Sequence, residues 1–145
     1  MDHVVYVDAK AGELMKILAG KKTMLIRGAA GRKMPYGRVS GGDVLYLIEN
    51  DGSGVIRARA KVNSVNNSEK MTRDESLAVV EKYQDQLQLT KLQLKRWAGK
   101  RYLVLIEIDN VEKLDSFYVD KSEYGNMDDW LPVGKIEKIR VGKKI

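Results

Sequence analysis

The order of the elements predicted along this chain indicates an α+β fold: a small mixed β-barrel or strongly bent sheet with flanking helices. Short apolar, β-branched runs recur along the 145 residues, helical spacing occurs in three places, and no repeat or linker divides the chain. Many short strands with few helices favour a barrel or a bent sheet, and closure removes exposed sheet edges. We therefore expect one domain over residues 1–145, long enough to bury a core.

The first half of the chain is expected to hold four strands and one helix. Leu14, Ile17 and Leu18 recur at helical spacing, and Gly20 follows where a left-handed helix end favours a residue without a Cβ. The predicted elements are strands at 4–7, 23–26, 44–48 and 55–62 and a helix at 11–19. Residues 28–42, with five glycines and Pro35, form a long loop, and such loops are usually functional or disordered.

The second half is expected to begin with two helices and to continue with strands. Thr72 with Glu75, and Thr90 with Gln93, have the spacing of a capping box, which marks a helix start. Gly99 is expected to end the second of these helices. The predicted strands are a strong one at 102–108 and shorter ones at 117–119 and 136–141, and the acidic residues of 120–129 are expected to form a solvated loop.

Composition excludes several classes of function. The chain has no cysteine, which excludes disulfides, iron–sulfur clusters, thiolate zinc sites and cysteine nucleophiles. Its one histidine, His3, argues against a catalytic metal centre or a Ser-His-Asp relay, and we predict neither a metal nor a cofactor. No apolar run approaches the roughly 20 residues that span a bilayer, and the N-terminus lacks the layout of a secretion signal. We expect a cytoplasmic protein without a membrane partner.

The charges are unevenly distributed, and this points to a polyanionic partner. The net charge is +6, with a pI near 9.4. Between Leu14 and Gly42 there are seven basic residues and no acidic one. A field of one sign attracts nucleic acid, because lysine and arginine displace the counterions held by phosphates. RNA or a nucleotide is therefore the expected partner, while the acidic stretch at 107–129 leaves a protein-interaction module open. Oligomeric state is not predicted.

The segment Ile17–Arg27 resembles the signature of the ASCH family, which is related to PUA domains. The family pattern is Gly-x-Lys-x-x-Glu-x-Arg after a short helix, and Gly20, Lys22 and Arg27 match it. Leu25 stands where the pattern has glutamate. Looser similarities at 42–45 and 101–106 extend the resemblance over residues 3 to 109. It implies a PUA-like β-barrel with helices packed around it, a cleft beside the signature, and RNA or a modified nucleotide as ligand.

The resemblance also implies an alternative, a hydrolase acting on modified or single-stranded RNA. Some small bacterial members of the family are amidohydrolases of acetylated cytidine, and a lysine at the position of Lys22 assists a threonine nucleophile there. That threonine falls at Leu25, which cannot be a nucleophile. Thr23 is a conceivable substitute, and a ribonuclease is the other hydrolase that we consider. Whether the chain is an enzyme stays open.

The candidate ligand-binding residues are cationic or aromatic, because arginine pairs with phosphate and aromatic rings stack on bases. Lys22 and Arg27 are expected to floor the cleft, and the residues of the 28–42 loop are expected to form a flexible basic arm. The others come from the strand predicted at 55–62, where basic and apolar residues alternate, and from the rim of the cleft. The predicted nucleic-acid-binding residues are Lys22, Arg27, Arg32, Lys33, Tyr36, Arg38, Arg57, Arg59, Trp97, Lys100 and Trp130. Tyr124 and Asn126 are expected to close the same pocket. The alternative for the cations is a solvated surface, and for the tryptophans a place in the core.

Overall fold

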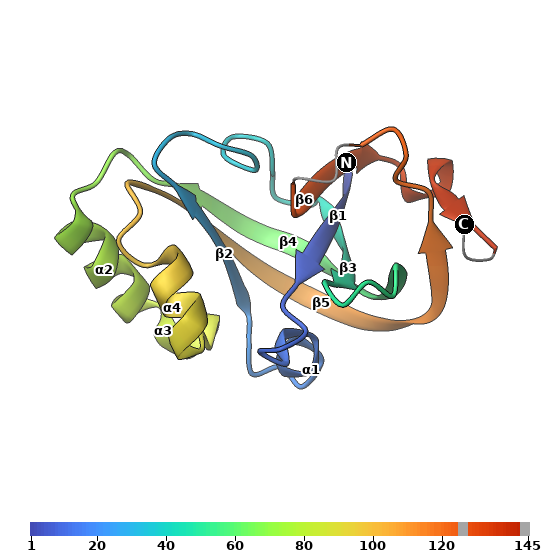
Figure 1. Ribbon diagram of the computed structural model, residues 1–145, viewed down its shortest axis with the longest axis horizontal. Coiled ribbons are helices and arrows are strands. Elements are labelled where there is room, and N and C mark those ends of the chain that lie inside the picture. The colour runs from blue at the N-terminus through green and yellow to red at the C-terminus, as the bar shows by residue number, and fades with distance from the viewer. Residues whose placement is uncertain (125–127, 143–145) are drawn as a thin grey trace.

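The computed structural model describes residues 1–124 and 128–142 of the chain. In these residues one strongly bent mixed sheet is accompanied by helices (Figure 1). The helices are α1 (Glu13–Leu18), α2 (Arg73–Lys82), α3 (Gln84–Leu87) and α4 (Lys91–Trp97). The strands are β1 (Asp2–Val7), β2 (Met24–Ala29), β3 (Val44–Glu49), β4 (Val55–Asn67), β5 (Tyr102–Val119), β6 (Trp130–Gly134) and β7 (Arg140–Val141).

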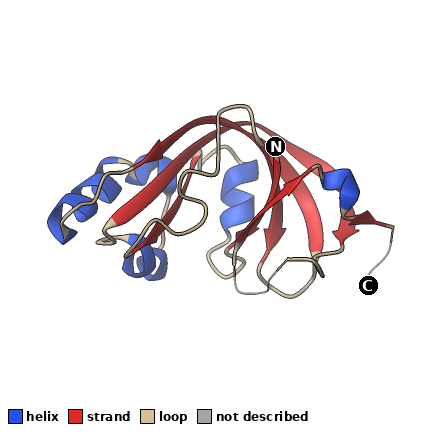
Figure 2. Cartoon of the chain, turned by 90° about the horizontal axis from the view of Figure 1, so that it is seen from above, coloured by secondary structure: helices blue, strands red, loops and turns tan. Residues whose placement is uncertain are grey.

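The sheet runs in the order β2-β5-β4-β3-β1-β6, and β7 pairs with the far end of β5. The pair β1–β3 is parallel, and the other pairs are antiparallel. The pairing of β4 with β5 shifts register in several places, and such irregularities bend and twist a sheet. The sheet curls into a half-barrel that arches over α1 (Figure 2), which confirms the predicted α+β, PUA-like fold.

Alternation along β2 separates two layers of packing. Leu25 belongs to the cluster on the concave side of the sheet, which also includes Ile17 of α1. Met24 and Ile26 face the other way, into a cluster with Val80 and Trp97 from the helical side. Since side chains alternate along a strand, Arg27 projects to the same concave face as Leu25. One strand therefore joins the helices to the hollow of the half-barrel.

A close approach of backbone to side chain fixes the end of β2. A Cβ on Gly28 would lie 2.8 Å from Leu103 Cδ2 and 3.1 Å from Lys100 Cβ. The absent side chain thus lets β2 lie tightly against the start of β5 and the turn after α4. Further along, the Met34–Pro35 peptide is cis, and the side chain of Pro35 is buried.

The predicted helix starts are confirmed, and three of the predicted strands need correction. Both capping boxes are formed, at Thr72 with Glu75 and at Thr90 with Gln93. The two strands expected at 102–108 and 117–119 are a single strand, β5, because its irregular pairing with β4 carries it across the charged middle. The strand expected at 136–141 is a 3₁₀ turn, Ile136–Lys138, followed by the two-residue β7. Strand β6 was not predicted.

None of the helices in residues 1–124 and 128–142 is long and apolar enough to cross a membrane.

Candidate functional site

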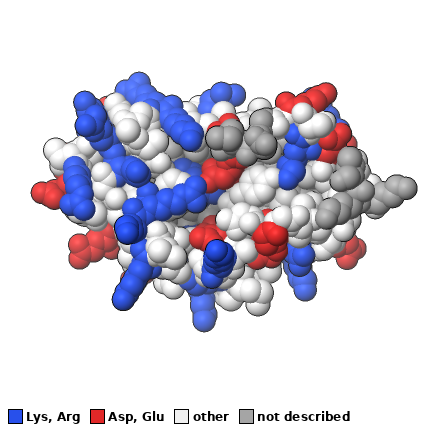
Figure 3. Space-filling view, viewed as in Figure 1, with Lys and Arg blue, Asp and Glu red and all other residues white. Residues whose placement is uncertain are grey.

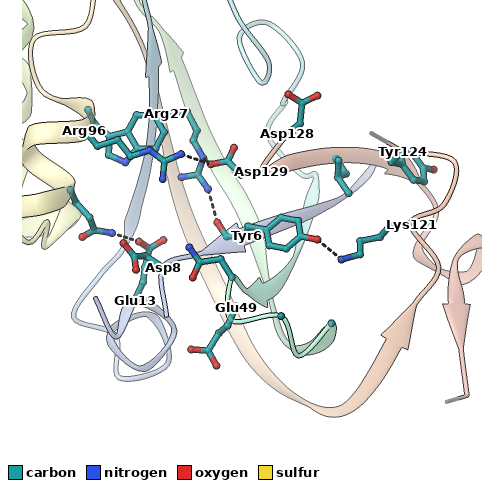
Figure 4. Close-up of a pocket in the computed structure, with 16 residues that line it drawn as sticks. Tyr6, Asp8, Glu13, Arg27, Glu49, Arg96, Lys121, Tyr124, Asp128 and Asp129 are labelled. Carbon is teal, nitrogen blue, oxygen red and sulfur yellow. Dashed lines mark hydrogen bonds and ion pairs between the residues drawn. The ribbon is translucent and has the colours of Figure 1, made fainter. Parts of the chain in front are cut away.

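Two adjacent cavities lie at the concave side of the sheet, next to the C-terminal end of α4. The larger has a volume of about 420 Å³ and the smaller about 260 Å³. They meet at a common boundary formed by Arg27, Arg96, Trp97, Asp128 and Asp129, which line both. The larger cavity is drawn in Figure 4, where β1, β2, α1 and the segment before β6 surround it. The chain therefore builds one concave surface with two compartments.

Arg27 is the best-fixed residue of the boundary. Its Nη1 donates to the carbonyl of Ile26 at 2.8 Å, and its Nη2 donates to the carbonyl of Tyr6 at 2.7 Å. The guanidinium lies 5.5 Å from the ring centroids of both Trp97 and Trp130. Only 7% of the residue is exposed. Two backbone acceptors and two indole rings thus hold a positive charge in place between the cavities.

Asp129 completes the boundary, because one of its carboxylate oxygens pairs with two arginines. Its Oδ2 lies 3.2 Å from Arg27 Nε and 3.5 Å from Arg96 Nη2. Arg96 in turn stacks on Trp97, with its guanidinium carbon 4.3 Å from the ring centroid. We expected Asp128 and Asp129 to lie in a solvated acidic loop; Asp128 is exposed as expected, whereas Asp129 is half-buried and pairs with two arginines. Both aspartates line the cavities, because the pairing of β6 with β1 brings the preceding residues back to the end of β2.

The smaller cavity is basic and aromatic. Lys33, Tyr36, Lys100 and Tyr102 are among the residues that line it. Tyr36 anchors the 28–42 loop, because its hydroxyl donates to the carbonyl of Ser68 at 2.5 Å. Its ring meets that of Tyr102 edge to face, with the centroids 5.7 Å apart. The guanidinium carbon of Arg32 lies 5.6 Å and 5.7 Å from these two ring centroids. The exposed Arg32 therefore packs on a pair of tyrosine rings that contact each other.

The larger cavity has acidic and polar walls (Figure 4). Glu13 of α1 is buried and accepts a hydrogen bond of 2.6 Å from Gln93 Nε2. On the other side, Lys121 donates to the hydroxyl of Tyr6. Asp8 and Glu49 add two more carboxylates to the lining. This compartment offers hydrogen-bond acceptors to a ligand, whereas the smaller one offers cations.

Lys22, which was expected at the floor of the cleft, lines neither cavity. Only 2% of it is exposed, and its Nζ donates to the carbonyl of Leu87. Burial lowers its pKa from 10.5 to about 8, opposed by the charge of Glu13 and assisted by Arg27. The amine is thus a buried cation that interacts electrostatically with Glu13, and Glu13 lines the larger cavity.

The structure brings several of the predicted residues together and separates others. Arg27, Lys33, Tyr36, Trp97 and Lys100 line the cavities. Beneath Arg27, Trp130 is 1% exposed and packs in the core, as the alternative for the tryptophans anticipated, and Arg32 stands beside the smaller cavity on Tyr36. The lining does not include the exposed Arg38 and Arg57, or Arg59, whose Nη2 pairs with Glu112 at 2.7 Å. Asn126 lies outside the described residues, whereas Tyr124 lines the larger cavity.

The hydrogen-bond acceptors of the larger cavity were not predicted from the sequence. Gln93 was interpreted only as a helix cap, although its amide also reaches Glu13. Glu13 precedes the helical repeat of α1 and carried no motif. One signal was available: Glu13 is a charged residue directly before a buried helical face, and such a carboxylate needs a partner. Among residues 1–124 and 128–142, no three His, Asp or Glu side chains gather as ligands for a metal ion.

Charge is divided across the face that carries the site. Figure 3 shows Lys and Arg side chains gathered over the left part of this face, where Figure 1 has β2 and the helices α2 to α4. Carboxylates border the hollow near the centre of the same face (Figure 3). The basic side chains thus lie on the helical side of this face, and the carboxylates lie around the hollow itself.

The half-barrel is the fold of ASCH proteins. The ASCH protein of Zymomonas mobilis superposes with a TM-score of 0.67 at 13% identity, over 94% of this chain and 90% of that one. A tyrosine-to-phenylalanine variant of it matches with the same TM-score and identity, over 94% and 93%, and a serine-to-alanine variant over 94% and 91%. The resemblance to the ASCH family is thereby confirmed at the level of the fold.

The sequence itself matches a family model over residues 9–124, described as "Domain of unknown function (DUF365)". The chain belongs to this family. No curated protein matches the chain significantly.

Proposed function

We propose that the protein binds single-stranded RNA or a nucleotide across the two joined cavities. One observation carries the proposal: exposed cations, aromatic rings and the buried Arg27 share a single concave surface with a compartment of acceptor groups. Phosphates favour lysine and arginine, and the edge of a base offers N–H donors to carboxylates. The smaller cavity would take the backbone, and the larger one a base.

In this proposal the cations and the aromatic rings have different tasks. Lys33 and Lys100 are exposed at the smaller cavity and free to follow a phosphate chain. Trp97 is a support rather than a stacking platform, because Arg96 and Arg27 stack on its ring at 4.3 Å and 5.5 Å. A base would instead stack on the planar guanidinium of Arg96, whose side chain is 58% exposed.

The salt dependence of RNA binding tests the proposal. With about four phosphates of single-stranded RNA bound, the log of the association constant should fall against the log of salt with a slope near −3. The double variant Lys33→Ala, Lys100→Ala should reduce that slope by roughly 1.4, since two phosphate contacts are lost. The matched control is Arg57→Ala, Lys61→Ala, on exposed positions of β4 outside the cavity linings. A slope near zero, or equal losses in both variants, would contradict the proposal.

Hydrolysis of modified or single-stranded RNA is the second candidate, and the lowered pKa of Lys22 favours it. An amine with a pKa of about 8 exchanges its proton near neutral pH. The geometry favours binding, however, because this amine donates to the carbonyl of Leu87 and Leu25 is fully buried in the core. Incubation with acetylcytidine and with labelled RNA, followed by mass spectrometry, decides between the two. Product from the wild type that disappears in Lys22→Ala would establish hydrolysis.

A further inference from the structure

We propose that Arg27 and Arg96 form a subsite for one phosphate group, and that in the free protein the carboxylate of Asp129 occupies it. This inference rests on the proposed function and deepens it. A ligand phosphate would replace the Asp129 carboxylate between the two guanidinium groups. Asp129 would then act as an internal competitor that weakens the binding of every phosphate-bearing ligand.

The contacts of Asp129 show that it satisfies the two arginines incompletely. Both cations approach the same oxygen, Oδ2, at 3.2 Å and 3.5 Å, although charge-assisted N–H···O bonds are normally shorter. Arg27 Nε is buried and has no well-aligned hydrogen-bond acceptor among residues 1–124 and 128–142. A buried donor without an acceptor is unfavourable. A tetrahedral phosphate offers separate oxygens to each arginine and would correct this.

The cationic half of the subsite is built in advance. The carbonyls of Ile26 and Tyr6 and the rings of Trp97 and Trp130 fix the Arg27 guanidinium without help from Asp129. Its position would therefore stay the same when one anion replaces another, and preorganised groups bind without a further ordering cost.

The carboxylate of Asp129 can leave the subsite without rearranging the fold. The backbone carbonyl of Asp129 accepts a hydrogen bond of 3.0 Å from the amide of Tyr6, which ties the backbone to β1. Its side chain is 33% exposed, and that of Arg96 is 58% exposed. Rotation of one side chain is thus sufficient to release the carboxylate into solvent.

The location defines the class of ligand. Arg27, Arg96 and Asp129 line both cavities, so a phosphate here has space on two sides. The acceptor-lined cavity lies on one side and the basic cavity on the other. This fits a nucleoside monophosphate whose base enters the larger cavity, or an internal phosphodiester of RNA whose chain continues along Lys33 and Lys100.

Two single variants of equal charge test the inference. Asp129→Asn keeps the shape and removes the competing charge, so affinity for nucleoside 5′-monophosphates should rise about tenfold at fixed ionic strength. Asp109→Asn removes the same charge at an exposed position of β5 that lines neither cavity, and should change affinity less than threefold. The corresponding nucleosides should bind both variants as they bind the wild type. Calorimetric titrations with the four monophosphates, the four nucleosides and inorganic phosphate measure these effects.

Further arms separate the sources of the phosphate and the role of Arg96. In Asp129→Asn, the further change Arg96→Gln should cancel the gain, because one half of the subsite is lost. If the affinity for inorganic phosphate rises as much as the affinity for the monophosphates, the subsite binds phosphate as a simple anion. If the affinity for a short RNA rises most, the subsite binds the phosphodiester. Equal gains in both Asn variants, no gain in Asp129→Asn, or a gain for the unphosphorylated nucleosides would overturn the inference.

A measurement on the wild type covers the case in which Asp129→Asn does not fold. The Arg27 Nε–H resonance in a ¹⁵N spectrum should shift when nucleoside monophosphate is added, and no shift would overturn the inference. The two proposals also fail separately. RNA binding without a gain in Asp129→Asn removes only this inference, whereas the absence of RNA binding in the wild type and all variants removes the proposed function.

Discussion

Lys22 and Arg27 are two buried cations of one motif, and the protein accommodates them in different ways. Arg27 spreads its charge over two carbonyls, two indole rings and Asp129. Within residues 1–124 and 128–142, Lys22 donates only to the carbonyl of Leu87. A compact ammonium loses more hydration on burial than a guanidinium. The pKa of Lys22 is lowered for this reason, and Lys22 should therefore leave a signature in the pH dependence of stability.

Replacing Lys22 by methionine should remove that signature. Between about 8, its pKa in the fold, and 10.5, its ordinary value, the unfolded chain holds a proton that the folded chain has lost. The free energy of unfolding of the wild type should thus rise relative to Lys22→Met across this window, by about 1.4 kcal/mol per pH unit. Urea unfolding at pH 7, 8.5 and 10 measures it. Lys21→Met, at an exposed neighbour, is the control and should follow the wild type. Parallel curves for wild type and Lys22→Met would contradict this.

At the scale of elements, α4 connects local helix chemistry to the site. Gln93 closes the capping box by accepting from the Thr90 amide at 3.1 Å, and its Nε2 donates to Glu13 at 2.6 Å. One turn further along, Arg96 and Trp97 form part of the cavity boundary. The start of this helix therefore sets the position of three residues of the site.

Two equivalent caps give a matched pair of variants. Thr90→Ala and Thr72→Ala each remove a hydroxyl that accepts from the amide at N3 at 3.2 Å. Each should lower the free energy of unfolding by about 1 kcal/mol. Thr90→Ala alone should also weaken RNA binding several-fold, because α2 contributes no residue to the lining of either cavity. Chemical denaturation and RNA titration measure the two effects. Equal binding by the two variants would show that the cap of α4 does not position the site.

At the scale of the whole molecule, His3 joins segments that are far apart in the sequence. Its Nε2 donates to Asp43 at 2.9 Å, just before β3, and its Nδ1 accepts from Trp130 Nε1 at 3.1 Å. An acceptor at Nδ1 requires the neutral ring. Burial lowers the pKa of His3 below 6.5, although Asp43 opposes the shift. Protonation would thus break the link between β1 and β6 beneath Arg27.

Acid should weaken the fold through this residue. The contribution of neutral His3 is complete above pH 6.5 and is lost as the pH falls toward the lower pKa of the folded state. In that window the free energy of unfolding should drop by about 1.4 kcal/mol per pH unit. The variant His3→Gln should show a flatter profile between pH 7.5 and 5 in urea unfolding. The same acid sensitivity in His3→Gln would assign the loss to carboxylates instead.

The local secondary structure of this protein follows from short stretches of sequence. Capping boxes at Thr72 and Thr90, the glycine after α1 and the apolar run of β3 each depend on neighbours a few residues away. The motif Gly20-x-Lys22-x-x-x-x-Arg27, together with the looser similarities at 42–45 and 101–106, indicated the ASCH-type fold. Its alternation also places Leu25 and Arg27 on one face of a strand.

Only the tertiary structure determined which remote residues of the chain contact each other. Strand β6 was not foreseen, because Trp130–Gly134 becomes a strand only through pairing with β1. That pairing brings Asp129 next to Arg27, which stands 102 positions earlier in the sequence (129 minus 27). Residues that were expected in a solvated acidic loop therefore line the site. Glu13 meets Gln93 in the same way. Sequence fixes which groups carry charge and which elements hold them, whereas long-range packing alone determines which charges neutralise each other, because that depends on distances between remote segments.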